Sequence, residues 1–578
     1  MSVRRIASWT GTAIAIGVAA LFLVRQLAEQ PYSNIYPEDY VGPDACRDCH
    51  EDSHQENFES WQGHAHRTMN QNPDEDSVKG DFSGATLRYG RGHAVFHREG
   101  PSFVMSLYEG DRLVRRHVVT RTVGSLYVQY YIGRQTKGPE PRGHRTYTTE
   151  SKLPFGYSIA LDRWLPEVYF DSTFEEERVY LEGGPQRDYI YARPPSHNWN
   201  FSCLNCHNTY PYVARLWHQR ERRREREREK WRGGFPREAV EWRGPTEHQG
   251  RLRIADRIRA LHGDELVTVG ISCESCHFGG REHAREEREI RFVPTGADLT
   301  IRRPGSDVPL ASDRKDPLVI NSICGQCHNA DLDTWPDGSH AVNSSEALAM
   351  DAGACSGAIK CTDCHDPHEA GPGSGSPDRQ GDFEACLGCH PQLEDSAERA
   401  KHTRHSAKVN CLDCHMPRIV SGLDTVVRSH RISTATDSRM LGGHAPNACN
   451  LCHLDRPIAW TLRELQKGWG YEAPAEATPG NGQHPEGPLG EAWLRSPNSF
   501  LRAAAAEAYA RAPRVESRIQ LLLESLKDEQ AFNRTLGLIA VERVLGRRIP
   551  EDEYDLLAPP ETRARQAAEL SGAVHAGR

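Results

Sequence analysis

The pattern Cys-x-x-Cys-His occurs eight times in this chain and restricts its structure more than any other feature. Random placement of 17 cysteines and 28 histidines along 578 residues predicts about 0.02 such motifs. The motifs contain sixteen of the seventeen cysteines, which excludes an ordinary disulfide framework and a cytosolic thiol enzyme. The motifs are Cys46/Cys49/His50, Cys203/Cys206/His207, Cys273/Cys276/His277, Cys324/Cys327/His328, Cys361/Cys364/His365, Cys386/Cys389/His390, Cys411/Cys414/His415 and Cys449/Cys452/His453.

Each motif has the residues that covalent haem attachment requires. Two cysteines three positions apart can form thioethers to both vinyl groups of one haem, and the next histidine is then held under the iron as the proximal ligand. The alternative is zinc, which paired Cys-x-x-Cys sequences bind as a tetrahedral thiolate site. Zinc sites do not require a histidine directly after the second cysteine, and all eight motifs have one. We therefore predict eight covalently bound haem c groups.

The other twenty histidines are candidates for the distal ligand on the opposite face of each iron. Local context favours His66, His283, His368, His402, His405 and His430, and more weakly His64, His197, His340 and His444. We expect structural roles for the histidines in apparent strands or in the cysteine-free tail, which are His93, His97, His117, His144, His484 and His575. The context of His54, His218, His248 and His262 is uninformative.

The number of available histidines decides what coordination we expect. Eight proximal ligands need eight distal ones, and ten candidates are present, so we predict that all eight irons are six-coordinate and low spin. His283 lies six residues after His277, which is too short a loop to reach the opposite face of the same haem. We expect His283 to bind a neighbouring one. The seventeenth cysteine, Cys355, is predicted to be a buried free thiol, with a redox or sulfur-chemistry ligand as the alternative.

The N-terminal segment indicates export. Ile6–Val24 has nineteen residues without a charge, and a helix of this length reaches about 28 Å, just enough to cross a hydrocarbon core. Arg4 and Arg5 precede it and Arg25 follows, which favours a cytoplasmic N-terminus only weakly. A cleaved signal peptide is the alternative. We predict a retained inner-membrane anchor with the haem domain in the periplasm or otherwise outside the cytoplasm.

The remaining chain divides by composition. Between residues 85 and 192 there are no cysteines, and short β-branched and aromatic runs alternate with glycine-containing turns, which indicates antiparallel strands. Paired helical patterns near the C-terminus are similar to HEAT-type hairpins. The predicted parts are 1–30 (anchor or signal), 40–84 (first haem module), 85–192 (β-rich insertion), 193–456 (seven-haem domain) and 457–578 (helical repeat-like region).

The predicted fold class follows from the lean apolar content. Only 37% of the residues are hydrophobic, so we expect eight porphyrins to supply much of the core. The expected architecture is a haem-packed, mostly helical and irregular structure with a β-rich insertion, a C-terminal HEAT-like region and one N-terminal transmembrane helix. The net charge of −9 gives no basic surplus for nucleic acid. Residues 219–232, which mix both charges, and the Gly/Ser/Pro-rich residues 369–381 are expected to be solvated connectors.

Several runs resemble known multihaem cytochromes. YVGPDACRDCHEDSHQENFESWQGHAHRTM resembles the opening haem module of multihaem cytochromes c of nitrogen-cycle bacteria. HNWNFSCLNCH, GISCESCHFGGREH, KCTDCHDPH, HTRHSAKVNCLDCHMPR, VRSHRIS and PNACNLCHLD resemble exported or membrane-associated members whose haem region is followed by helical repeats. The resemblance covers about residues 40–456. GISCESCHFGGREH is more distantly similar to hydroxylamine oxidoreductase and pentahaem nitrite reductase, which implies shared haem packing and bis-histidine ligation at most sites.

Two departures from these enzymes favour an electron carrier. The nitrite reductases hold their catalytic iron with a Cys-x-x-Cys-Lys motif, and this chain has none. Hydroxylamine oxidoreductase needs a tyrosine cross-linked to its active haem, and nothing around Tyr471, Tyr509 or Tyr554 marks such a role.

Three functional hypotheses remain open. The main one is an octahaem cytochrome that relays electrons between a membrane quinol-oxidising complex and another redox protein. The second is an oxidoreductase that transforms a small nitrogen or sulfur compound at one open-coordinated haem. In the third, which is compatible with both, the C-terminal helices dock the protein in a larger complex.

Overall fold

The structure is a computed structural model that describes most of the chain after residue 31. The described residues are 32–50, 55–172, 189–192, 194–195, 199, 203–216, 231–244, 266–286, 288–311, 313–369, 383–406, 409–474, 487–512 and 518–576. Several predictions fall on residues outside these ranges, namely Ile6–Val24, most of the two connectors, and His54, His197, His218, His248, His262 and His484. Within the described ranges, no helix combines the length and the apolar character needed to span a membrane.

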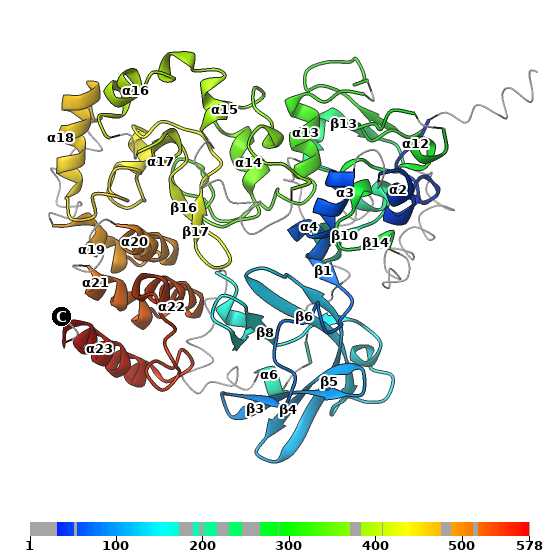
Figure 1. Ribbon diagram of the computed structural model, residues 1–578, viewed down its shortest axis with the longest axis horizontal. Helices are drawn as coiled ribbons and strands as arrows, with labels where there is room; N and C mark the ends of the chain where they lie inside the picture. Colours follow the sequence, from blue (N-terminus) through cyan, green and yellow to red (C-terminus); the bar gives the residue numbers. More distant parts are fainter. Residues whose placement is uncertain are drawn as a thin grey trace, which may run out of the picture.

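A nine-stranded antiparallel sheet is the largest regular element (Figure 1). Its main path is β2-β3-β4-β5-β6-β8-β9, with β1 paired to β5 and β7 paired to β6. The strands are β1 (Asn70–Gln71), β2 (Ala85–Tyr89), β3 (Gly92–Glu99), β4 (Ser102–Glu109), β5 (Arg112–Val123), β6 (Val128–Lys137), β7 (Ser151–Lys152), β8 (Phe155–Ser158) and β9 (Arg163–Pro166). Gly90, Gly100 and Gly110 begin the tight turns between β2 and β5 with φ near +60°, a conformation that favours glycine.

Aromatic side chains fill the core of this sheet. Phe96 on β3 stacks on Trp164 on β9 with ring centroids 3.6 Å apart. Phe82 meets both rings edge-on and also contacts Tyr131 on β6. Side chains therefore supply the core here.

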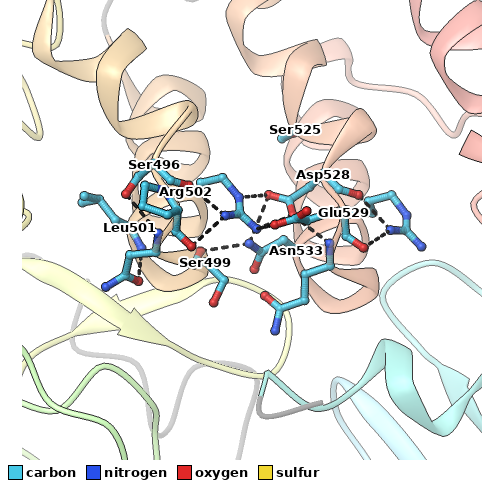
Figure 2. Close-up of polar contacts among 12 residues, drawn as sticks. Ser496, Ser499, Leu501, Arg502, Ser525, Asp528, Glu529 and Asn533 are labelled. Atoms are coloured by element: carbon cyan, nitrogen blue, oxygen red, sulfur yellow. Dashed lines mark hydrogen bonds and ion pairs between the residues drawn. The ribbon is translucent and has the colours of Figure 1, made fainter. Parts of the chain in front are cut away.

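Helices dominate the C-terminal part of the chain, drawn in orange to red in Figure 1. They are α18 (Ile458–Trp469), α19 (Leu489–Leu494), α20 (Ser499–Arg511), α21 (Ile519–Leu523), η11 (Glu524–Lys527), α22 (Ala531–Leu545) and α23 (Pro560–Ala576). A buried ion pair ties α20 to the turn before α22, because Arg502 of α20 donates to both carboxylate oxygens of Asp528 at 2.7 and 2.9 Å (Figure 2). Asn533 of α22 also donates to Asp528.

The sheet and the C-terminal helices share one core. Arg534 of α22 donates to the hydroxyl of Tyr169, which follows β9, and that hydroxyl donates to the carbonyl of Leu556. Arg163 of β9 donates to the carbonyl of Ile549. One cluster of buried apolar side chains runs from the sheet through Trp335 and the β16–β17 hairpin to these helices. The region 85–192 is thus packed against 457–578 rather than forming an isolated insertion.

Outside the nine-stranded sheet and the C-terminal helices, the described residues form short helices, 3-10 turns and two-stranded ribbons (Figure 1). The α-helices are α2 (Pro43–His50), α3 (Gln55–Gln62), α4 (Ala65–Thr68), α6 (Tyr189–Ala192), α8 (Leu204–His207), α11 (Cys273–Cys276), α12 (Arg281–Glu286), α13 (Pro317–Cys324), α14 (Glu346–Asp351), α15 (Glu384–Leu387), α16 (Ser396–Thr403) and α17 (Cys411–His415). The 3-10 turns are η1 (Pro37–Asp39), η2 (Arg145–Tyr147), η3 (Glu167–Tyr169), η4 (Arg237–Ala239), η6 (Cys361–Asp363), η7 (Pro391–Leu393) and η8 (Ser438–Met440). The ribbons pair β10 (Asn208–Thr209) with β14 (Thr268–Val269), β11 (Trp231–Arg232) with β12 (Phe235–Pro236), β13 (Val240–Trp242) with β15 (Leu299–Ile301), and β16 (Arg418–Ser421) with β17 (Val426–Arg428).

The predicted fold class is wrong. A haem-packed, mostly helical or irregular structure was expected, but the described residues build a large antiparallel sheet whose apolar side-chain core continues into the C-terminal helices. They contain no cluster of three or more metal-binding side chains and no membrane-spanning helix. The prediction failed because a low overall apolar fraction does not report where the apolar residues are. In this chain the buried aromatic and aliphatic residues concentrate in the sheet and in 457–578.

Candidate haem-binding sites

Each motif folds into about one turn of helix. In six motifs the backbone N–H of the histidine donates to the carbonyl of the first cysteine at 2.9–3.1 Å, as in His277 to Cys273. The histidines of the first and seventh motifs end the helices α2 and α17. One turn brings the residues at positions one, four and five together, so both thiols and the imidazole of a motif lie beside one another.

Six motif histidines each face a second histidine from elsewhere in the chain. The ring centroids of these pairs are 6.1–6.4 Å apart, and the second member is in every case one of the six favoured distal candidates. The pairs are His50 with His283 (6.2 Å), His328 with His66 (6.4 Å), His277 with His368 (6.2 Å), His365 with His430 (6.1 Å), His415 with His402 (6.2 Å) and His453 with His405 (6.1 Å).

This spacing fits one iron between two imidazoles. Two imidazoles that bind one metal from opposite sides have centroids about 6 Å apart, because each metal–nitrogen bond is about 2 Å and each ring centre lies about 1 Å farther back. Rings in direct contact would be closer, as His64 and His66 are at 4.7 Å. A haem iron takes only two protein ligands, so a pair, and not a cluster of three side chains, is the arrangement that a haem requires.

Hydrogen bonds orient several of these rings. Nδ1 of His283 lies 2.5 Å from the carbonyl of Arg288, and Nδ1 of His415 lies 2.7 Å from the carbonyl of Ser433. A carbonyl only accepts, so Nδ1 carries a proton in both rings, and in the neutral form of such a ring the lone pair is on Nε2. His405 is held in the same way by the carbonyl of Thr403 at 2.5 Å. These rings are in the tautomer that binds a metal through Nε2.

Burial keeps other candidate ligands neutral. Burial, together with the neighbouring His328 and His64, lowers the pKa of His66 to about 3. Burial also lowers the pKa values of His207 and His277 to about 4. A neutral imidazole has a free lone pair near neutral pH. His328 differs. Burial lowers its pKa, but the hydrogen bond and the charge of Glu346, together with Cys327 and Cys361, raise the pKa to about 9.

Within the described residues, no imidazole faces the other two proximal histidines, His207 and His390, at a comparable distance. His207 is half-buried, and its Nδ1 is buried without a hydrogen-bond partner. His390 is exposed. Of the weaker distal candidates, His64 is buried and caps α4 by accepting from the N–H of His66 at 3.0 Å. His340 is buried with an unpartnered Nδ1, and His444 is exposed.

Four of the predicted attachment cysteines are exposed. They are Cys49, Cys364, Cys389 and Cys452, and each is the second cysteine of its motif. The other twelve motif cysteines are half-buried. Cys49 and Cys389 lie in short helical turns, α2 and the turn after α15. The motif pattern specifies the spacing of the thiols and carries no signal of their burial.

Cysteines of different motifs contact one another. Thiols of the first and third motifs lie close together, as do those of the second and fourth, the fourth and fifth, and the sixth and seventh motifs. These contacts are Cys46 with Cys273, Cys206 with Cys327, Cys324 with Cys361, and Cys386 with Cys411. The fourth motif therefore touches both the second and the fifth. Haems attached to these cysteines would have neighbouring edges.

The last points about the cysteines are their disulfide state and the position of Cys355. All seventeen cysteines lie within the described ranges, and none forms a disulfide. Cys355 is half-buried rather than buried as predicted, because it lies in a turn after α14. Its charge acts on the Cys386 thiol, so it lies near the sixth motif.

The sequence did not predict which side chains and carbonyl groups orient the paired histidine rings. Glu346 contacts Nδ1 of His328 from 18 positions away, and Trp460 packs on His453 with ring centroids 4.7 Å apart. The carbonyl groups of Ser433 and Arg288 carry no side-chain signal at all. The expected structural histidines His93, His97 and His117 lie on strands of the sheet, and His144 caps η2.

Comparison with known proteins found no family model, no curated protein and no solved structure that matches this chain. The resemblance to multihaem cytochromes therefore stays a prediction from the motifs.

Proposed function

We propose that this protein is an octahaem c-type cytochrome that relays electrons between redox partners. The observation that carries the proposal is the set of six histidine pairs, each joining a motif histidine to a remote histidine at 6.1–6.4 Å. Two imidazole ligands keep an iron's coordination constant in both oxidation states, which suits a haem that only passes electrons.

The contacts between motifs support a relay. Cysteine contacts connect motifs one with three, two with four, four with five, and six with seven. Cys276 in the third motif lies near Cys327 in the fourth, and Cys386 in the sixth lies near Cys364 in the fifth. Cysteines of the eighth motif act likewise on Cys414 in the seventh. The eight attachment sites thus form one continuous series with the second motif as a branch at the fourth.

Location and partners follow from the cofactor. Covalent haem attachment takes place outside the cytoplasm, so we infer that the protein is exported, and the apolar segment Ile6–Val24 agrees with an export sequence. The partners would be redox proteins or a quinol-oxidising complex of the membrane. The C-terminal helices are available as a docking module in a larger assembly.

An oxidoreductase is the second candidate. In the described part of the chain, His207 and His390 have no facing imidazole, and a haem that transforms a small nitrogen or sulfur compound needs one open iron position. His207 is the stronger candidate because it is half-buried with a buried Nδ1, whereas His390 is exposed to water.

Two measurements on the purified protein test the proposal. The intact mass should exceed that of the polypeptide by eight haem masses, after any signal cleavage is accounted for. Electron paramagnetic resonance of the oxidised protein should show low-spin iron and no stoichiometric high-spin signal. Zinc in place of iron, or markedly fewer haems, would refute the cytochrome. A high-spin signal that shifts on adding nitrite, hydroxylamine or cyanide would favour the oxidoreductase instead.

A further inference from the structure

One motif histidine is backed by a carboxylate. Nδ1 of His328 lies 2.8 Å from Oε2 of Glu346. Nε2 is the other ring nitrogen, and the ring centroids of His328 and His66 are 6.4 Å apart. Among the other motif histidines, His415 donates to the neutral carbonyl of Ser433, and Nδ1 of His207 and of His277 is buried without a partner.

The structure holds this carboxylate in place. Oε1 of Glu346 accepts from the backbone N–H of Ser344 at 2.9 Å, so both carboxylate oxygens are engaged. The segment around His328 is tied to the start of α14 by backbone hydrogen bonds from Ala347 to the His328 carbonyl at 2.9 Å and from Ala330 to the Ser344 carbonyl at 2.8 Å. Ser344 adopts φ of +70°, a left-handed conformation that is rare for a residue other than glycine. The loop thus accepts a strained residue while it presents Glu346 to the ring.

We propose that Glu346 lowers the reduction potential of the haem attached through Cys324, Cys327 and His328. This inference rests on the proposed function. A carboxylate that accepts the Nδ1 proton gives the imidazole partial imidazolate character and makes it a stronger donor to iron. The added negative charge stabilises ferric over ferrous iron, so the potential falls. A neutral carbonyl at the same place, as at His415, has a smaller effect.

The lowered reduction potential would affect electron transfer along the whole series, because this haem would lie between several others. Its cysteines contact those of two other motifs, Cys206 of the second and Cys361 of the fifth. Electrons that move between the N-terminal and C-terminal motifs would pass through this haem. Its reduction potential would be lower than with a neutral hydrogen-bond acceptor in the place of Glu346. The charge of Glu346 also acts on His430, which faces His365 of the fifth motif, so a smaller effect on that haem is expected.

The test is a spectroelectrochemical titration of holoprotein carrying Glu346→Gln. Glutamine is the same size and still accepts a hydrogen bond, but it has no charge. We expect one haem's share of the absorbance change to shift to higher potential relative to wild type. Asp351→Asn is the matched control, because Asp351 is an exposed carboxylate on the same helix that touches no histidine, and it should leave the titration unchanged.

A second variant keeps the inference falsifiable if Glu346→Gln fails to retain haem. Glu346→Asp keeps the charge but moves it one methylene away from His328, so a smaller upward shift is expected. Superimposable titrations of wild type and of every variant that retains eight haems by mass would overturn the role of Glu346. A wild-type protein without haem would instead refute the proposed function, so the two failures are distinguishable.

Discussion

At the scale of single residues, the remote histidine in each pair is the group most open to test. We predict that His283→Ala converts one low-spin haem to high spin, because removal of an imidazole that faces His50 leaves that iron without its sixth ligand. Electron paramagnetic resonance of the oxidised protein measures the spin count. His93→Ala is the control, since His93 stacks on Tyr108 in the sheet at 5.1 Å and should leave every haem low spin. An unchanged spin count in His283→Ala would reduce this histidine to a surface contact.

The sequence identified the candidate ligands better than their partners. Local context singled out six histidines, and the structure brings each of them opposite a motif histidine. Which two meet could not be predicted, because a pair such as His66 and His328 depends on how distant segments pack. Glu346 was missed for the same reason. An acidic residue 18 positions after a motif has no local signal that relates it to the ring.

At the scale of secondary-structure elements, the ion pair between α20 and the turn before α22 should be important for stability (Figure 2). Arg502 and Asp528 have exposed side-chain fractions of only 11% and 4%. We predict that Arg502→Ala lowers the free energy of unfolding by about 3 kcal/mol, since it leaves a buried carboxylate without its cation. Thermal unfolding followed by circular dichroism measures the loss.

A matched variant tests whether burial is the cause. Arg495 also contacts a carboxylate, Glu491, one helix turn away at 3.4 Å, but their exposed side-chain fractions are 71% and 37%. Arg495→Ala should therefore cost at most about 0.5 kcal/mol. Equal losses of unfolding free energy in the two variants would show that burial does not make the Arg502–Asp528 ion pair more stabilising than an exposed pair.

Local sequence patterns predicted the positions of strands and helices along the chain. They predicted less well how these elements pack against one another. Strands β2 to β9 fall within the interval 85–192, and helices α18 to α23 fall within 457–578. The surroundings of α20 were not predictable, because the run Ala503–Ala506 is buried on all sides and shows no amphipathic period. The sheet also recruits Asn70–Gln71 from the first haem module, a two-residue pairing with β5 that is too short to recognise in a sequence.

At the scale of the whole molecule, the sheet and the C-terminal helices should respond together to one substitution. Arg534 of α22 is fully buried and donates to the carbonyls of Asp528 and Glu529 and to the hydroxyl of Tyr169. We predict that Arg534→Met increases hydrogen–deuterium exchange in Phe155–Tyr169 as well as in α22, because both ends of the shared core lose a contact. Mass spectrometry of peptides from the labelled protein resolves the two regions.

A control variant carries a substitution on the exposed face of α23. Arg565→Met on α23 removes an exposed cation, and it should leave exchange in the sheet unchanged. Faster exchange confined to α22 in the Arg534 variant would mean that the two regions are stabilised independently.

The N-terminal contacts set an order of events during biosynthesis. The backbone N–H groups of Val41 and Gly42 donate to the carboxylate of Glu274, more than 230 positions later, and Asn34 hydrogen-bonds both the carbonyl of Val293 and the N–H of Thr295. A chain that emerges from a translocon N-terminus first presents residues 32–50 long before these partners arrive. If the chain is exported and carries haem as proposed, the first Cys-x-x-Cys-His motif would meet the attachment machinery before residues 274–295, which hydrogen-bond to this module, are present.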